Sequence, residues 1–135
     1  MKVFIRPIFI VALLLTPVLA ASSSQDFTFA RESACDSEHD PYAPDKIIVE
    51  PKKSSLLVTG WVSVNCASYL INPSIIQNEN SIIINVDTPK IEPGQPIAAC
   101  LCTEKFTMKI NHKVRSGTVI HLTIGGHDSA QVAVP

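Results

Sequence analysis

Residues 55–66 read SLLVTGWVSVNC, and this stretch decides the fold class. Its side chains alternate with a period of two, with Leu56, Val58, Val62, Val64 and Cys66 in one phase and Leu57, Thr59, Trp61, Ser63 and Asn65 in the other. Successive side chains of a strand point to opposite faces, and β-branched residues favour strands. The stretch therefore predicts a strand with one buried face. Gly60 in its middle predicts a bulge or a close backbone approach.

Further short stretches of strand-like sequence lie on both sides, separated by turn signals about every 8–12 residues. They are 26–30, 46–50, 69–77, 81–86, 98–113, 118–124 and 130–134. Pro73 confines its segment to a sheet edge or a bend, and Asn78–Asn80 predicts a hairpin turn. No stretch of 11 or more residues has a helical period. The pattern predicts an all-β protein.

The architecture we expect is a single immunoglobulin-like β-sandwich of seven or eight short strands, spanning residues 26–135. A small β-barrel is the alternative. The likeness to immunoglobulin domains concerns architecture alone. Trp61 precedes Cys66 by only five residues and lies in the opposite phase, so the cysteine and tryptophan spacing of that family is missing.

The first 20 residues have the three parts of a secretory signal peptide. Lys2 and Arg6 form the positive region, residues 8–15 the apolar region, and Val18-Leu19-Ala20 the cleavage site. The polar residues 21–25 are expected to form a flexible lead-in. We therefore expect an exported protein, periplasmic or extracellular, with no membrane anchor in its mature form.

Composition argues against a nucleic-acid partner and against a disordered chain. Loss of Lys2 and Arg6 leaves nine cationic residues against 12 anionic ones, a net charge of −3. Nucleic-acid binders need clustered positive charge, so none is expected as a partner. A mean hydropathy of +0.24 is too apolar for a disordered chain.

The mature chain contains four cysteines: Cys35, Cys66, Cys100 and Cys102. In an oxidising compartment an even number predicts disulfides. Residues i and i+2 of a strand lie about 6.5–7 Å apart, so a bond between Cys100 and Cys102 is disfavoured. If Glu104 marks no bulge, Cys100 and Cys102 lie in the same phase as Phe106, Met108 and Ile110 and so face the core. We expect Cys66 to pair with one of them inside the sandwich and Cys35 with the other.

The alternative use of these sulfurs is a soft-metal site. Thiolates suit Cu(I) and Zn(II), so Cys66, Cys100 and Cys102 are candidate ligands, with Met108 and His112 further along the same strand. Otherwise no cofactor is expected.

The sequence shows no catalytic constellation. It contains no serine elbow and no paired carboxylates on a strand, so we expect a protein that is not an enzyme. The predicted function is a non-catalytic binding or accessory module for an unknown protein or small ligand. Its candidate contact residues are Leu57 and Trp61 on the outer strand face and Pro93 and Gly94 in the proline-rich loop 88–96.

Overall fold

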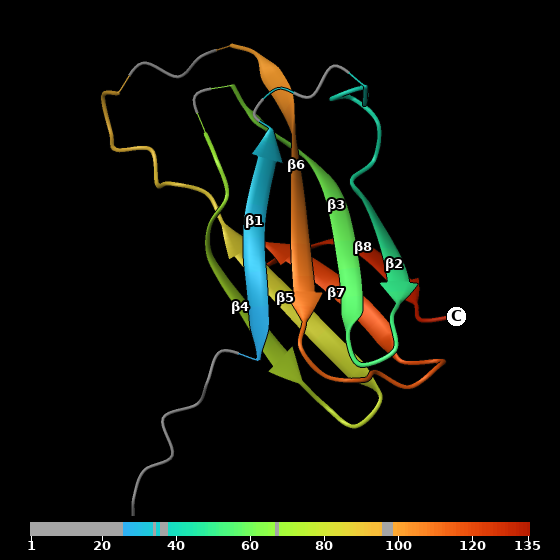
Figure 1. The fold of residues 1–135 in the computed structure, drawn as a ribbon. Helices are drawn as coiled ribbons and strands as arrows, with labels where there is room; N and C mark the ends of the chain where they lie inside the picture. The colour runs from blue at the N-terminus through green and yellow to red at the C-terminus, as the bar shows by residue number, and fades with distance from the viewer. Residues whose placement is uncertain (1–25, 34, 36–37, 67, 96–98) are drawn as a thin grey trace, which may run out of the picture.

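The chain forms two four-stranded β-sheets, as the computed structural model shows (Figure 1). The structure describes residues 26–33, 35, 38–66, 68–95 and 99–135. The expected signal peptide and lead-in lie outside these residues. The strands are β1 (Phe27–Ser33), β2 (Lys46–Pro51), β3 (Leu56–Asn65), β4 (Ile71–Gln77), β5 (Ser81–Asp87), β6 (Leu101–Ile110), β7 (Val119–Ile124) and β8 (His127–Ala133). Among the described residues, no helix is long and apolar enough to cross a membrane.

The first sheet has the order β1-β6-β3-β2 and is antiparallel throughout. Its central strand β3 is the stretch 55–66 of the sequence, and buried and half-buried residues alternate along it as predicted. The β3–β6 register places Val58 opposite Met108 and Val64 opposite Cys102. The buried phases of both strands consequently face the same core.

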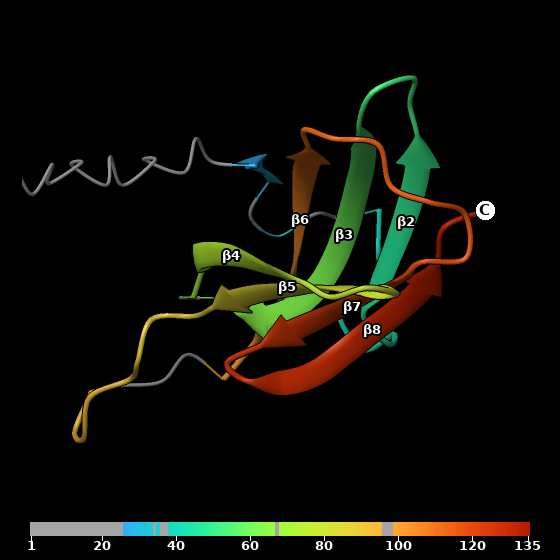
Figure 2. The ribbon, with the colours of Figure 1, turned by 90° about the horizontal axis from the view of Figure 1, so that it is seen from below.

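The second sheet has the order β4-β5-β7-β8 and contains one parallel pair, β5 with β7. A parallel pair needs a crossover connection, and here that connection includes β6 of the first sheet. The chain therefore passes from one sheet to the other and back between β5 and β7. Figure 2 shows the two layers from below, with β2 and β8 on the same side of the molecule.

Two separate sheets make this fold a sandwich, so the small closed barrel is wrong. The distribution of strands also differs from that of an immunoglobulin constant domain, where strands A, B, E and D form one sheet and C, F and G the other. Here the first, second, third and sixth strands form one sheet. The shared feature is the sandwich architecture.

The core lies between the sheets and is almost entirely aliphatic. Phe106 and Met108 of β6 are fully buried, as are Ile84 of β5 and Leu122 of β7. These residues belong to one hydrophobic cluster to which strands of both sheets contribute. Among the described residues, the two sheets therefore share this core.

The predicted strand ends lie within two residues of the observed ones, except in β1, β6 and β8. The predicted segment 98–113 contains β6 but extends three residues beyond each of its ends. Pro73 lies in the edge strand β4, where the register shifts between Ile71 and Ser74, as a strand proline requires. β1 continues past its predicted end to Ser33. β8 begins at His127, three residues earlier than predicted, because Gly125 and Gly126 alone make the turn, with φ angles of 57° and 83°.

Candidate functional site at the disulfide end of the sandwich

Cys66 and Cys100 lie directly opposite one another where β3 ends and β6 begins. Extending the β3–β6 register by two residues beyond Val64 and Cys102 pairs these two positions. The Cys66 N–H donates to the Cys100 carbonyl at 3.2 Å, and their Cα atoms are 5.6 Å apart. They form a disulfide that joins the two central strands.

Cys35 forms the second disulfide with Cys102, 67 residues further along the chain. It attaches the connection between β1 and β2 to β6. Together the two bonds confirm the prediction of a disulfide-stabilised domain in which Cys66 and Cys35 take the two sulfurs of the Cys-x-Cys segment. Paired cysteines in a small domain indicate an oxidising, exported environment.

The sequence predicted that Cys66, Cys100 and Cys102 all face the core, and this prediction is wrong for Cys100. Cys102 is buried and Cys66 half-buried, whereas Cys100 is exposed. The reason is its place in the chain: Cys100 lies one residue before the start of β6, outside the strand itself.

Glu104 causes no bulge in the β3–β6 pair, although Cys102, Thr103 and Glu104 are buried in succession. Its side chain is 1% exposed and lies on the same side of β6 as the core residues Phe106 and Met108. It accepts hydrogen bonds from Arg31 Nε of β1 and from the Leu70 N–H at 2.9 Å. A buried carboxylate is tolerated only when it is paired and hydrogen-bonded. Glu104 therefore joins β1 and the β3–β4 connection to β6.

An exposed apolar patch lies beside the Cys66–Cys100 bond. Tyr42 is 80% exposed and Leu101 is 44% exposed, and both line one shallow hollow together with Asn65, Ala99 and Cys100. We call these five residues the disulfide-end patch. Its members come from the β1–β2 connection, the end of β3 and the start of β6. The Asp40 carboxylate accepts a hydrogen bond from the Tyr42 N–H at 2.9 Å, which fixes the backbone at Tyr42.

The predicted contact residues do not form one surface. Leu57 and Trp61 are half-buried on the outer face of the first sheet, whereas Pro93 and Gly94 are exposed in the β5–β6 connection. The Lys46 and Lys105 ammonium groups lie 5.9 and 5.7 Å from the centroid of the Trp61 ring, and the His39 ring is 6.3 Å away. Side chains of this chain thus surround Trp61.

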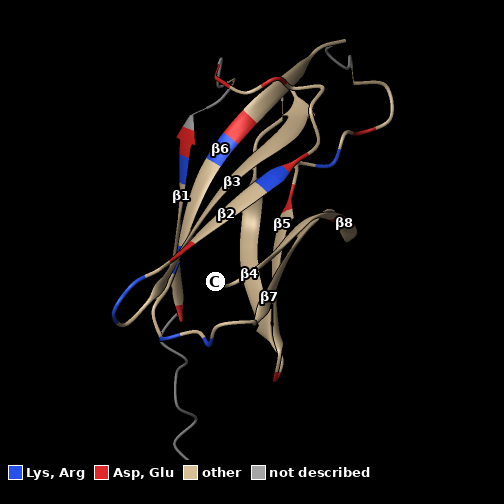
Figure 3. Ribbon diagram, turned by 90° about the vertical axis from the view of Figure 1, so that its right-hand side faces the viewer, with Lys and Arg blue, Asp and Glu red and all other residues tan. Residues whose placement is uncertain are grey.

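Charge is distributed unequally between the sheets (Figure 3). Every lysine and arginine that lies in a strand belongs to the first sheet: Arg31, Lys46, Lys105 and Lys109. The strands of the second sheet carry only two charged residues, Asp87 and Asp128. The described strands thus offer no basic surface on the second sheet.

The histidines do not gather at one place. His112 follows the far end of β6, and His39 lies beside Trp61. His121 lines a small hollow with Asp128 and Ser129, which are residue types of nucleophilic catalysis. The Ser129 hydroxyl, however, donates to the Asp45 carboxylate. A nucleophilic serine instead needs a hydrogen bond to its base.

The candidate metal ligands are only partly brought together. The sulfurs of Cys35, Cys66 and Cys102 all lie within 4.8 Å of one another, and this group, found among the described residues, does not include Cys100. Met108 is six residues from Cys102 along β6, about 20 Å at the rise of a strand. It is fully buried in the core, and His112 lies still further away. Neither side chain can share an ion with Cys102.

Three features of this end were missed from the sequence. They are the Arg31–Glu104 pair, the Tyr42–Leu101 hollow, and the Asp45 carboxylate, which accepts from the Ser63 N–H at 2.7 Å and from the Ser129 hydroxyl. Each joins residues that are distant along the chain. The only signal in the sequence was Glu104 itself, a charged residue in an apolar phase.

No protein-family model matches this chain, and searches of curated proteins and solved structures found no significant match.

Proposed function

We propose that the mature protein is an exported, non-catalytic binding module that contacts a protein partner through the disulfide-end patch. The observation that carries the proposal is the 80% exposure of Tyr42 beside the exposed Leu101, on a part of the fold held by two disulfides. Exposed tyrosines on a rigid support give a large contact area at low entropic cost.

Rigidity of the patch supports a binding role. Cys100 is itself a patch residue and is bonded to Cys66, while Cys35 fixes the connection that carries Tyr42. The Ser63 hydroxyl donates to the Pro41 carbonyl and so attaches the same connection to β3. A surface that is ordered before binding loses less conformational entropy when a partner docks.

Charge supports a partner of a particular kind. Glu38 and Asp40 are exposed in the connection that carries Tyr42, and no lysine or arginine is among the five patch residues. Opposite charge on the partner speeds association and orients it. The partner we propose presents an apolar side chain flanked by basic residues, in the periplasm or outside the cell.

The test is a capture experiment with matched variants. The mature protein is immobilised and exposed to the exported protein fraction of its source cells, alongside Tyr42→Ala/Leu101→Ser and the control Ile76→Ser. Ile76 is similarly exposed, at 51%, but lies on the edge strand β4. The proposal expects a partner that the wild type and control retain and the patch variant loses. Equal capture by all three proteins contradicts it.

A further inference from the structure

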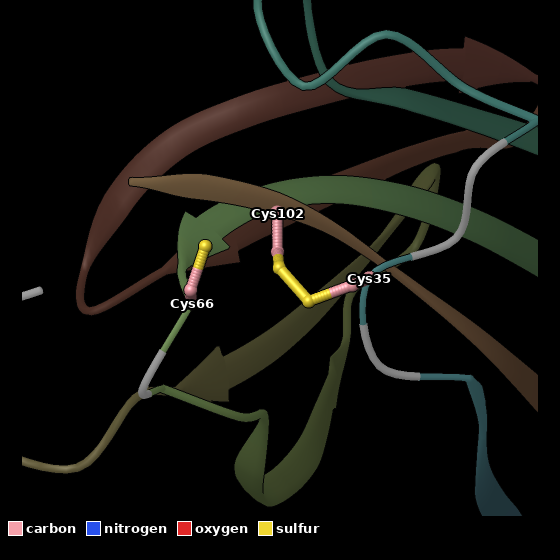
Figure 4. A group of neighbouring side chains, drawn as sticks. All are labelled: Cys35, Cys66 and Cys102. Atoms are coloured by element: carbon pink, nitrogen blue, oxygen red, sulfur yellow. A yellow bond between two sulfur atoms is a disulfide. The ribbon is translucent and has the colours of Figure 1, made fainter. Parts of the chain in front are cut away.

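The sulfurs of Cys35, Cys66 and Cys102 form a compact group of three (Figure 4). Each pair lies within 4.8 Å, although the residues come from three separate parts of the chain. Figure 4 shows the sulfur of Cys66 beside the Cys35–Cys102 bond. The Cys66 sulfur is itself bonded to Cys100, so at this point one disulfide lies directly against the other.

The backbone holds these three positions by contacts other than the disulfides. Cys102 is opposite Val64 in the β3–β6 ladder, and Cys66 continues the same strand pair through its 3.2 Å hydrogen bond to the Cys100 carbonyl. The connection that carries Cys35 is attached to β6, because the Thr103 hydroxyl donates to the His39 carbonyl at 3.0 Å. We expect the three thiols to stay near one another after reduction.

Reduction changes the chemistry of the group. Breaking both disulfides takes four electrons and four protons, which two equivalents of a dithiol reductant supply, each being oxidised to a disulfide. The products are four thiols, of which three are clustered. Deprotonated thiols are soft ligands and prefer Cu(I), Zn(II) and iron–sulfur clusters.

We propose that the reduced protein binds one Cu(I) ion through the thiolates of Cys35, Cys66 and Cys102, with release of their three protons. Cu(I) is favoured over Zn(II) because structural zinc sites are almost always four-coordinate. Among the described residues, the group contains three ligands. This set replaces Cys100, Met108 and His112 of the sequence prediction with Cys35. Metal and disulfides use the same sulfurs and exclude one another.

Burial fits this role. Cys102 is 6% exposed, Cys66 is half-buried, and Cys35 is exposed, so the group has an apolar inner side and an open outer side. An ion can enter past Cys35, while the core side shields its bonds to Cys102. The hydrophobic surroundings of a metal site limit access of solvent and oxidants.

The experiment uses the mature protein, reduced with a phosphine and freed of reductant under anaerobic conditions. Cu(I) is titrated against a chromophoric chelator that reports free copper, and circular dichroism follows the β-structure. The expected result is one Cu(I) per folded chain. The single variants Cys35→Ala, Cys66→Ala and Cys102→Ala should each weaken binding by more than about 100-fold, beyond the loss seen for outer-shell partners.

Cys100→Ala is the control, because the Cys100 sulfur, although bonded to that of Cys66, does not belong to the group of three sulfurs that all lie within 4.8 Å of one another. It should bind Cu(I) within a few-fold of the wild type. Loss of binding in Cys100→Ala together with retention in Cys35→Ala overturns the proposed ligand set.

A second measurement, the thermal midpoint with and without Cu(I), tests the proposal even if reduction destabilises the fold. Cu(I) should raise the thermal midpoint of reduced Cys100→Ala and leave that of Cys35→Ala/Cys100→Ala unchanged. Two further outcomes contradict the proposal. One is binding of equal strength in guanidinium, which means that the unfolded chain suffices. The other is a Zn(II) complex that needs all four cysteines.

Discussion

A Cβ atom added to Gly60 would lie 2.2 Å from Cε1 of Phe106. The two residues are opposite one another in the β3–β6 register, and Phe106 is fully buried. The ring thus occupies the space that any larger residue at position 60 would need. This is the close backbone approach that a glycine in the middle of β3 predicts, and the register there has no bulge.

Gly60→Ala should therefore destabilise the protein despite adding only one methyl group. Overpacking a core costs about 1–3 kcal/mol, and the rigid Phe106 ring has to move. The free energy of unfolding, measured by denaturant titration, should fall by an amount in that range. The control Thr59→Ala alters the neighbouring outer-face residue and should cost less. Equal stability of Gly60→Ala and wild type is incompatible with the packing described here.

Removal of Arg31 should leave the Glu104 carboxylate buried without its cation. Breaking a buried pair in this way costs about 3–5 kcal/mol. We expect a smaller loss from Arg31→Met, about 2 kcal/mol, because the arginine side chain is 39% exposed and water reaches the site. Thermal and denaturant unfolding at neutral pH measure this loss.

Two companion variants identify the cause of the Arg31→Met effect. Adding Glu104→Gln to Arg31→Met removes the carboxylate charge that has lost its partner. The double variant should therefore be more stable than Arg31→Met alone. Glu32→Gln breaks the more exposed Glu32–Lys105 pair on the same strands and should change stability by less than about 0.5 kcal/mol. A double variant that is less stable than Arg31→Met would show that burial of the charge is not the cause.

The two disulfides should stabilise the domain unequally. They close loops with sequence separations of 34 and 67 residues, and each should contribute about 2–4 kcal/mol. Doubling a loop adds about 0.6 kcal/mol of closure entropy. We expect Cys35→Ala/Cys102→Ala to lose more stability than Cys66→Ala/Cys100→Ala in guanidinium titrations. The reverse order would mean that the cross-strand bond is the more important constraint.

The period-two alternation of 55–66 and 106–110 was sufficient to predict the two central strands, because burial of one face imposes it directly on the sequence. The cysteine partners also followed, apart from the choice between Cys100 and Cys102. That choice depends on the β3–β6 register, which local sequence leaves open. The exposure of Cys100 depends on where β6 starts, and strand ends are difficult to predict.

The disulfide-end patch could not be predicted for a related reason. Tyr42 and Leu101 are 59 positions apart and meet only because the Cys35–Cys102 bond and the Asp45 contacts bring the β1–β2 connection against the sheet. The sequence instead indicated Leu57 and Trp61, since an apolar residue in the polar phase of a strand attracts notice. Neighbouring lysines lie over Trp61 in the fold.

The most direct test of a disulfide-stabilised exported module is a map of its sulfur linkages. The mature protein, purified from an oxidising compartment, is alkylated without reduction, digested and analysed by mass spectrometry. The expected result is no alkylated cysteine and two linked peptide pairs, Cys35 with Cys102 and Cys66 with Cys100. Free thiols in the exported protein, or a Cys35–Cys66 linkage, would contradict the disulfide-stabilised fold.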